Sequence, residues 1–218
     1  MIVKKDYKRI FAGLYSPKPG VPLIVDVPGF TYLMVSGKGH PEDGEFGLAA
    51  QTVFSMAYVS KFIFKEKRPE EDFVVMPMEV KWRLDRSARG SKRYSWTMMV
   101  MQPEGITDGI VGEALDRLAR RKKTPALAGR LRYQRYTAGT CGQILHVGPY
   151  GASMERTFGV LTSHLSAEGY DWEPDSLDVY YNDVRRCAPE KLRTLTRVRI
   201  WGKSGIQSAF EDPYLDPA

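Results

Sequence analysis

The sequence predicts the same order of secondary-structure elements, strand, helix, strand and strand, in each half of the chain. In the first half, apolar patterns and turn residues predict a strand over 30–37, a helix over 44–65 and strands over 72–84 and 94–102, with "SARGSK" as the turn between the last two. The second half starts again about 110 residues later with "TCGQILHVGPYG", a strand closed by glycines as the first one is. Two β-α-β-β modules, produced by duplication, constrain the fold more than any other feature.

The second module continues in the same way. Ser153 can cap a helix over 153–168, and Gly169 ends it. "SLDVYYND" and "LRTLTRVRIWG" then read as two strands. A connecting helix over 107–123, opened by Thr107, joins the modules.

These modules predict an α+β protein. Their strands are expected to pair antiparallel with the helices on one face of the sheet, which leaves the other face free for a central ligand cleft. A chain of 218 residues can form one such domain. Its parts are expected to be modules over about 30–105 and 130–202, an N-terminal arm over 1–29 and a C-terminal tail over 203–218.

The composition, 43% hydrophobic and 27% charged, is that of a soluble globular protein. The first 20 residues contain no apolar signal-peptide core. Gln51, Ser60 and Lys61 interrupt the apolar stretch over 46–64, so a buried helix explains it better than a membrane span. The two cysteines have neither a disulfide-framework nor a metal-site spacing. We therefore expect a cytoplasmic protein without a membrane partner.

The net charge of +6 raises the question of nucleic acid. The basic residues gather in "RLARRKK", "RLRYQR" and the last predicted strand. The first run lies where a helix should end, and cations favour that end of the helix dipole. We interpret it as a solvated helix end, with a phosphate-binding patch as the alternative, and do not expect nucleic acid as a partner.

A carboxylate interrupts the apolar stretch "VVMPMEVKWRL" at Glu79. Strand alternation puts Glu79 on one face, and Val80 and Trp82 on the face that a helix should cover. If "SLDVYY" is the equivalent of "PMEVKW", Asp178 stands where Glu79 stands. We therefore predict that Glu79 and Asp178 approach one shared cleft. The alternative is a Glu79 outside any cleft, neutralised by a nearby Lys or Arg.

Soft and aromatic side chains are expected around these two acids. Such residues suit flat, hydrophobic or cationic ligands through stacking, cation–π contact and adaptable packing. The alternative for each of them is a place in the core. The candidate ligand-binding residues are Glu79, Trp82, Trp96, Met99, Met101, Tyr133, His146, Tyr150, Asp178 and Tyr180.

Several stretches resemble the GyrI-like small-molecule-binding proteins, in the stand-alone subgroup built from two fused modules. They include "LIVDVPGFTYLMVSGKGHP", "DFVVMPMEVKW", "WTMMVMQP", "QILHVGPYG" and "VYYNDVRRCAPEKLRTLTRVRI", in order over roughly 22–200. The resemblance implies a duplicated α+β fold whose cleft binds lipophilic, often cationic, aromatic compounds. Some members of this subgroup are described as hydrolases that open the cyclopropane ring of DNA-alkylating cyclopropanoid antibiotics.

The family's motifs carry its two acids onto Glu79 and Asp178. Trp82, Trp96 and Tyr180 fall on aromatic positions of the same motifs. The chain departs from the family at "SLDVYY", where two histidines are absent and a Glu is shortened to Asp178. The shorter acid affects an inherited catalytic role more than a binding role.

The tentative catalytic residues are Glu79, Asp178 and Tyr150. Opening a strained ring requires an aromatic clamp, a carboxylate to activate water and a donor for the developing oxyanion. Glu79 is the candidate base, Asp178 a second acid or cation partner, and Tyr150 a donor. His146 is an alternative donor, although a histidine at the end of an apolar strand is more often structural.

The leading hypothesis is a protein that binds planar, hydrophobic, often cationic aromatic molecules, as in multidrug or xenobiotic binding. The alternative is a cyclopropanoid hydrolase, and a third is a protein-interaction role such as gyrase modulation. The sequence contains no GxSxG elbow and no P-loop, and its three histidines are scattered. We expect no metal and no cofactor.

Overall fold

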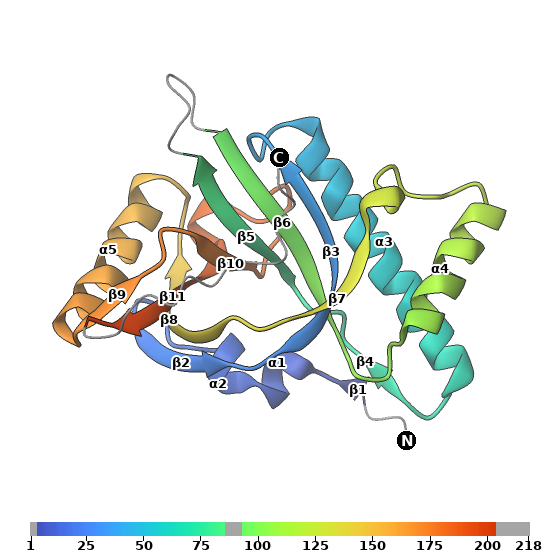
Figure 1. Ribbon diagram of the computed structural model, residues 1–218, viewed down its shortest axis with the longest axis horizontal. Helices are drawn as coiled ribbons and strands as arrows, with labels where there is room; N and C mark the ends of the chain where they lie inside the picture. The colour runs from blue at the N-terminus through green and yellow to red at the C-terminus, as the bar shows by residue number, and fades with distance from the viewer. Residues whose placement is uncertain (1–3, 86–92, 204–218) are drawn as a thin grey trace.

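The computed structural model describes residues 4–85 and 93–203. Within them, nine antiparallel strands form one sheet (Figure 1). Eight follow the order β2-β8-β11-β10-β5-β6-β3-β7, and β9 pairs with β11. Their bounds are β2 Leu23–Val27, β8 Gly139–Val147, β11 Arg193–Gly202, β10 Ser176–Tyr180, β5 Met78–Asp85, β6 Arg93–Gln102, β3 Phe30–Lys38, β7 Arg132–Tyr136 and β9 Tyr170–Trp172.

Three longer helices and several short elements complete the fold. The longer helices are α3 Gly44–Lys67, α4 Asp108–Arg120 and α5 Ala152–Ala167. The short elements are α1 Tyr7–Ile10, α2 Ala12–Tyr15, the 3-10 helices Ala128–Arg130 and Pro189–Lys191, and a parallel pair of β1 Lys4–Lys5 with β4 Asp72–Phe73. No helix among the described residues has the length and hydropathy of a membrane span.

The elements follow the predicted order in both halves. The first half runs β3, α3, β5, β6 and the second β8, α5, β10, β11. The sheet order mirrors the halves about the junction between β5 and β10. The predicted α+β class, with a large antiparallel sheet, is confirmed. The "SARGSK" turn and nearly all of the C-terminal tail lie outside the described residues.

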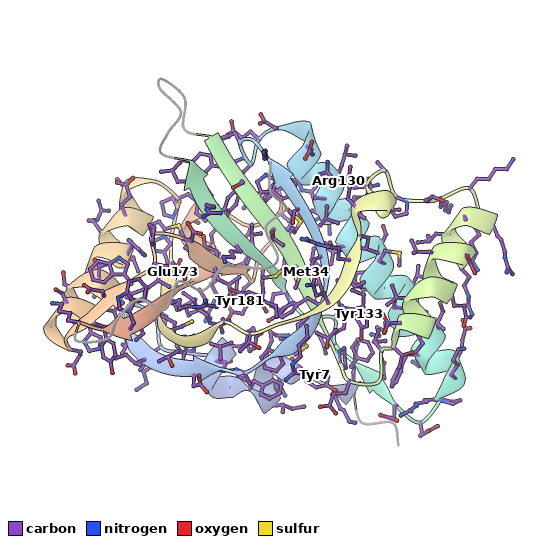
Figure 2. All side chains as sticks on the ribbon, viewed as in Figure 1. Tyr7, Met34, Arg130, Tyr133, Glu173 and Tyr181 are labelled. Carbon is purple, nitrogen blue, oxygen red and sulfur yellow. The ribbon has the colours of Figure 1, made fainter. Side chains whose placement is uncertain are left out.

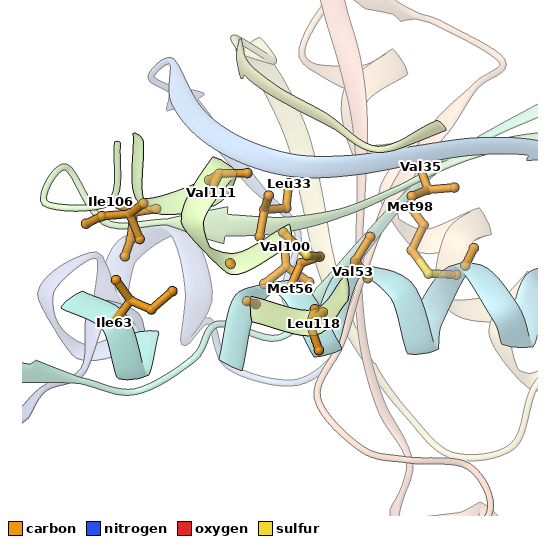
Figure 3. Close-up of a cluster of buried hydrophobic side chains, with 14 of the residues drawn as sticks. Leu33, Val35, Val53, Met56, Ile63, Met98, Val100, Ile106, Val111 and Leu118 are labelled. Atoms are coloured by element: carbon orange, nitrogen blue, oxygen red, sulfur yellow. The ribbon is translucent and has the colours of Figure 1, made fainter. Parts of the chain in front are cut away.

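Helices α3 and α5 cover one face of the sheet, here called the helix face. Residues directly opposite each other in antiparallel strands point to the same side. Val80 lies opposite Met98, which lies opposite Val35, and all three belong to the buried cluster that includes residues of α3. Figure 3 shows Val35 and Met98 beside Val53 of α3. Ile144 and Val198, on the same side of β8 and β11, pack against α5. In particular, α3 lies on β3 and β6, and α5 lies on β8 and β9.

The N-terminal arm covers the opposite face, here called the arm face. Met34, Met99 and Leu195 of the sheet form a second buried core with Tyr15 of α2. Figure 2 shows Met34 and Tyr181 among the side chains of this region. The prediction of an open ligand cleft on this face is wrong, because the arm, residues 4–20, and its apolar side chains fill it.

The two helices approach the sheet closely. In β8, Gly142 lies under α5, and a Cβ atom at this position would come within 2.7 Å of the Leu165 side chain. Helix α4 begins at the N-cap Thr107, whose hydroxyl accepts a hydrogen bond from the amide of Ile110. It packs against α3 rather than against the sheet (Figure 1). Helix α3 thus lies on the β3 and β6 side of the helix face, and α5 lies on the β8 side.

Candidate functional site

The register of β5 and β10 separates the two acids that the sequence analysis placed together. Asp178 lies opposite Val80, and Glu79 lies opposite Val179. Asp178 therefore points to the helix face and Glu79 to the arm face. The assumed equivalence of "PMEVKW" with "SLDVYY" is therefore off by one residue. Because side chains alternate along a strand, an offset of one residue puts the side chain on the other face. The prediction of a shared cleft is wrong for this reason.

Glu79 lies in the core of the arm face, with 0% of its surface exposed. The Tyr15 hydroxyl donates to its Oε1 at 2.7 Å, and the Tyr32 hydroxyl donates to its Oε2 at 3.4 Å. Nη1 of Arg197, also fully buried, lies 3.8 Å from Oε2. Burial raises the pKa of Glu79, and Arg197 and the two tyrosines oppose this rise. The alternative considered for Glu79, neutralisation by a nearby Arg, is the arrangement found.

Asp178 lies on the helix face and is only 5% exposed. Within residues 4–85 and 93–203, its Oδ1 has no hydrogen-bond partner. Burial raises its pKa to about 7. The hydroxyls of Thr196, Tyr180 and Ser176 oppose this rise, but none reaches Oδ1 with hydrogen-bond geometry. A buried carboxyl with one unsatisfied oxygen is costly for the fold, and such groups cluster at functional sites.

A directed hydrogen-bond chain ends on the other oxygen of Asp178. The Trp82 indole N–H donates to the Tyr180 hydroxyl at 2.9 Å. The Tyr180 hydroxyl donates to Asp178 Oδ2 at 3.5 Å. Because an indole N–H can only donate, Tyr180 accepts from Trp82 and directs its single proton away from it. The chain holds Oδ2, so among the described residues Oδ1 is the carboxylate oxygen left without a hydrogen bond.

Aromatic side chains flank this acid in the strip between α3 and α5. The Tyr150 ring is 40% exposed and meets the Tyr180 ring edge-to-face, with centroids 6.4 Å apart. The Thr194 hydroxyl donates to the Tyr150 hydroxyl at 3.4 Å. Trp82 is partly exposed, and its ring stacks on Phe46 of α3 with centroids 5.4 Å apart. We call Trp82, Tyr150, Asp178, Tyr180 and Thr194 the central strip.

Two further candidates, Trp96 and His146, lie on the helix face near the central strip and are buried. Trp96 lies opposite Trp82 in the sheet and is buried in the core under α3. His146 lies opposite Thr194, with Nδ1 2.8 Å from the Thr157 hydroxyl and Nε2 3.1 Å from the Pro149 carbonyl oxygen. Both ring nitrogens of His146 have partners, which fits a structural histidine.

The remaining candidates are away from the central strip. Met99 and Met101 are buried in the core of the arm face. The hydroxyl of Tyr133, in β7, donates to the Ile106 carbonyl at 2.6 Å, beside α4. Of the ten predicted ligand-binding residues, the structure thus gathers four: Trp82, Tyr150, Asp178 and Tyr180.

The sequence analysis did not identify several residues that lie around Asp178 or Glu79. Phe46 and Thr194 belong to the helix face, and Tyr15 and Arg197 surround Glu79. An arginine in the apolar context "TLTRVRI" was a usable signal, because a charge inside a buried strand requires a partner. Tyr15 offered none, because it lies in the N-terminal arm, outside both predicted modules.

The central strip offers partly exposed aromatic side chains and a carboxyl with a pKa of about 7, which can accept a proton near neutral pH. Such a group can orient or deprotonate a bound water, or pair with a cation. Among the described residues, no three His, Cys, Asp or Glu side chains form a group suited to hold a metal ion. The chemistry of the strip is therefore argued from its own side chains.

The chain was compared with protein families, curated proteins and solved structures. No protein-family model and no curated protein match the chain. It is similar to the crystal structure of a hydrolase from Listeria innocua, with 28% identity and a TM-score of 0.79 over 91% of this chain and 100% of that one. It is also similar to an uncharacterized conserved protein from Listeria innocua, with 29% identity and a TM-score of 0.81 over the same shares.

A more distant likeness extends to EcmrR in a cryo-EM structure of its DNA complex. The identity is 9% and the TM-score 0.50, over 84% of this chain and 57% of that one, so only the fold is shared. The mixed fold with its large antiparallel sheet is thus common to all three neighbours. These neighbours are consistent with the GyrI-like resemblance seen in the sequence.

Proposed function

We propose that the protein binds hydrophobic, planar aromatic small molecules at the central strip. The observation that carries this proposal is the unsatisfied Oδ1 of Asp178 between the partly exposed rings of Trp82, Tyr150 and Tyr180. Aromatic walls with one convergent polar group are typical of small-molecule sites. On the arm face the carboxylate of Glu79 already has hydrogen bonds from Tyr15 and Tyr32, so the proposal does not place the aromatic ligand there.

Cationic ligands should bind best. The pKa of Asp178 is about 7, so a nearby positive charge would favour the ionised carboxylate and supply the partner that the protein lacks. The rings of Trp82 and Tyr150 would add stacking and cation–π attraction. A neutral ligand of the same shape would gain only the stacking.

Titration with the planar cation rhodamine 6G, followed by tryptophan quenching, tests this proposal. Asp178→Asn should weaken binding about tenfold, equal to about 1.4 kcal/mol, and should affect an uncharged planar analogue less. The matched control is Glu79→Gln, an equal change on the arm face, which should leave the dye affinity unchanged in the folded protein. Dye binding that survives both Asp178→Asn and Trp82→Ala would overturn the proposal.

A second candidate function is hydrolysis, with cyclopropanoid alkylating compounds as the substrate class implied by the family resemblance. Two observations favour it: an acid with a pKa of about 7, and 28% identity to a protein called a hydrolase. A general base is most effective when its pKa lies near the working pH. Asp178, rather than Glu79, is then the base.

The reaction can be assigned to the central strip atom by atom. A water on Oδ1 of Asp178 attacks a cyclopropane carbon as the carboxylate takes its proton. The ring C–C bond breaks, and its electron pair moves into the conjugated dienone to give a phenolate. The Tyr150 hydroxyl can donate a hydrogen bond to the developing phenolate. The phenolate then takes a proton from solvent, and Asp178 returns its proton to solvent. Stacking of Trp82 would hold the flat substrate in line with the water.

Incubation with a cyclopropanoid compound, followed by mass spectrometry for the ring-opened product, separates binder from enzyme. Asp178→Asn should lower the rate by about 100-fold or more while the folded protein still binds the compound. The rate should rise with pH through about 7 as Asp178 ionises. A rate unchanged in Asp178→Asn would remove the hydrolase assignment and leave the binding proposal standing.

A further inference from the structure

The side chain of Tyr15 lies on the arm face in a pocket built by other parts of the chain. Only 2% of Tyr15 is exposed. Its hydroxyl donates to Glu79 Oε1 at 2.7 Å, and the guanidinium of Arg197 lies 4.9 Å from its ring centroid. The hydroxyl of Tyr32 approaches the same carboxylate. A phenol ring is thus held by a cation over its face and an acceptor at its hydroxyl.

The backbone next to Tyr15 is also held by side chains of the sheet. The Gln143 amide donates to the Gly13 carbonyl at 3.1 Å, and Arg197 donates to the Leu14 carbonyl. The Tyr181 hydroxyl donates to the Tyr15 carbonyl at 2.6 Å. In these three contacts the sheet provides the donor and the arm the acceptor. A bound peptide is recognised in the same way, through its carbonyl groups.

Residues 7–16 lie between two anchored ends of the arm, since β1 pairs with β4 and the amide of Gly20 donates to the Leu145 carbonyl. Helices α1 and α2 contain four residues each, too few to be stable alone. Within residues 4–16, Tyr15 is the one buried side chain, and Tyr7, Phe11 and Leu14 are only partly buried. Segments with little buried surface open locally at a lower cost than the core. Residues 7–16 can therefore open locally while the sheet and the two ends of the arm stay in place.

We propose that this pocket is a binding site for phenolic compounds and that the chain's own Tyr15 occupies it as a tethered ligand. A free phenol that displaces Tyr15 would donate to Glu79 and stack under Arg197, and the arm would open. Among the described residues, Nη1 of Arg197 has no hydrogen-bond partner, although its side chain is fully buried. A carbonyl or carboxylate on the phenolic ligand could use this donor. The site is on the opposite face from the central strip and does not depend on its function.

Chemical rescue of a cavity variant tests the pocket directly. Tyr15→Ala in the full chain removes a p-cresol-sized group, and p-cresol should refill the space, as small aromatics fill engineered cavities. At ten times its Kd, p-cresol should raise the Tm of this variant by about 3–5 °C. Toluene, which lacks the hydroxyl, should raise it much less. The matched control is Tyr58→Ala, which removes a tyrosine that is 48% exposed on α3 and should not respond.

The native protein tests whether a free phenol displaces Tyr15, even if the cavity variant does not fold. Hydrogen exchange of residues 7–16 should increase saturably with p-cresol in the wild-type chain, while exchange in β8 and β11 stays constant. Equal effects of toluene and p-cresol would overturn the assignment of a phenol site. Exchange of residues 7–16 that does not respond to p-cresol would overturn displacement of the arm. Neither outcome bears on dye binding at the central strip.

Discussion

The two faces of the sheet treat a buried carboxylate in opposite ways. On the arm face, Glu79 has two hydrogen-bond donors and the buried Arg197 beside it. On the helix face, Asp178 accepts a long hydrogen bond from Tyr180 at Oδ2, and its Oδ1 has no hydrogen-bond partner among the described residues. The residues are neighbours in paired strands, since Asp178 lies opposite Val80.

The number of hydrogen-bond partners distinguishes a structural acid from a candidate ligand-binding acid more clearly than burial does. Both acids are nearly inaccessible to solvent, so burial alone would class them together. A fully partnered acid can accept a ligand only where one of its partners leaves, and removing a charge partner harms the fold. An acid with a missing partner lowers stability and gains from a ligand that supplies it. The following predictions test this contrast, from the largest expected effect to the smallest.

Loss of the charge partner on the arm face should have the largest effect. Arg197→Met leaves Glu79 as an uncompensated buried charge, so the free energy of unfolding should fall by about 3–5 kcal/mol. Urea denaturation measures this. In Arg185→Met, the control, the lost partner is an 84% exposed arginine side chain paired with Asp183, and the change should stay below about 1 kcal/mol. Similar losses in both variants would contradict the role of burial.

Removal of the acid on the helix face should stabilise the protein at high pH. The folded pKa of Asp178, about 7, lies above its ordinary value of 3.8. Between these values the folded state holds a proton that the unfolded state has lost, so stability falls as pH rises from about 4 to about 7. At 1.36 kcal/mol per pH unit, the full loss is about 4 kcal/mol.

Asp178→Asn should abolish this decline, which urea denaturation at a series of pH values would measure. The variant should then be more stable than the wild type at pH 8. Asp183→Asn is the control, because the pKa of Asp183 is about 2 and its own effect on stability falls below pH 4. An unchanged slope in Asp178→Asn would mean that Asp178 has an ordinary pKa.

The aromatic wall of the central strip should have an intermediate effect. Trp82→Phe keeps a ring but removes the N–H that orients Tyr180, so the Kd for a planar cationic dye should rise about tenfold. Fluorescence titration measures the Kd. Trp172→Phe, a change under α5 in β9, should leave it constant. A Kd that responds equally to both changes would argue against binding at the strip.

The smallest effect is expected from the weakest hydrogen bond. Tyr180→Phe removes the donor to Asp178 Oδ2, so the pKa of Asp178 should rise by about half a pH unit. Carboxyl-carbon NMR titration would measure this shift. Tyr58→Phe, on the exposed side of α3, should not change it. A fall in the pKa of Asp178 would reverse the assigned direction of the hydrogen-bond chain.

Local patterns predicted most of the elements. The predicted helix over 44–65 is α3, Gly44–Lys67, and the one over 153–168 is α5, Ala152–Ala167. Apolar periodicity carries this information in a few neighbouring positions. The predicted cap Ser153 is wrong, because it lies inside α5, whose N-cap is Gly151. The elements that were not predicted, such as α2 and β2 in the arm, are short and depend on contacts with distant strands. No local pattern reports such contacts.

The candidate site depended on register, which local patterns fix poorly. Alternation along β5 placed Glu79 correctly on the face away from α3. The position of Asp178 was then copied from an assumed equivalence of two strands, and a slip of one residue reversed its face. Tyr150, Tyr180 and Trp82 were expected near an acid and do lie near one, although that acid is Asp178 alone.

The mirrored order of strands puts the meeting line of the two halves between β5 and β10, and the central strip lies across it. Trp82 comes from the first half, and Tyr180, 98 residues later, accepts its hydrogen bond from the second. Neither half carries a complete set of these groups. Contacts between such distant residues form late in folding, because long loops must close first. Ligand affinity therefore reports whether both halves have folded. A chain with only one folded half should show no binding at the central strip.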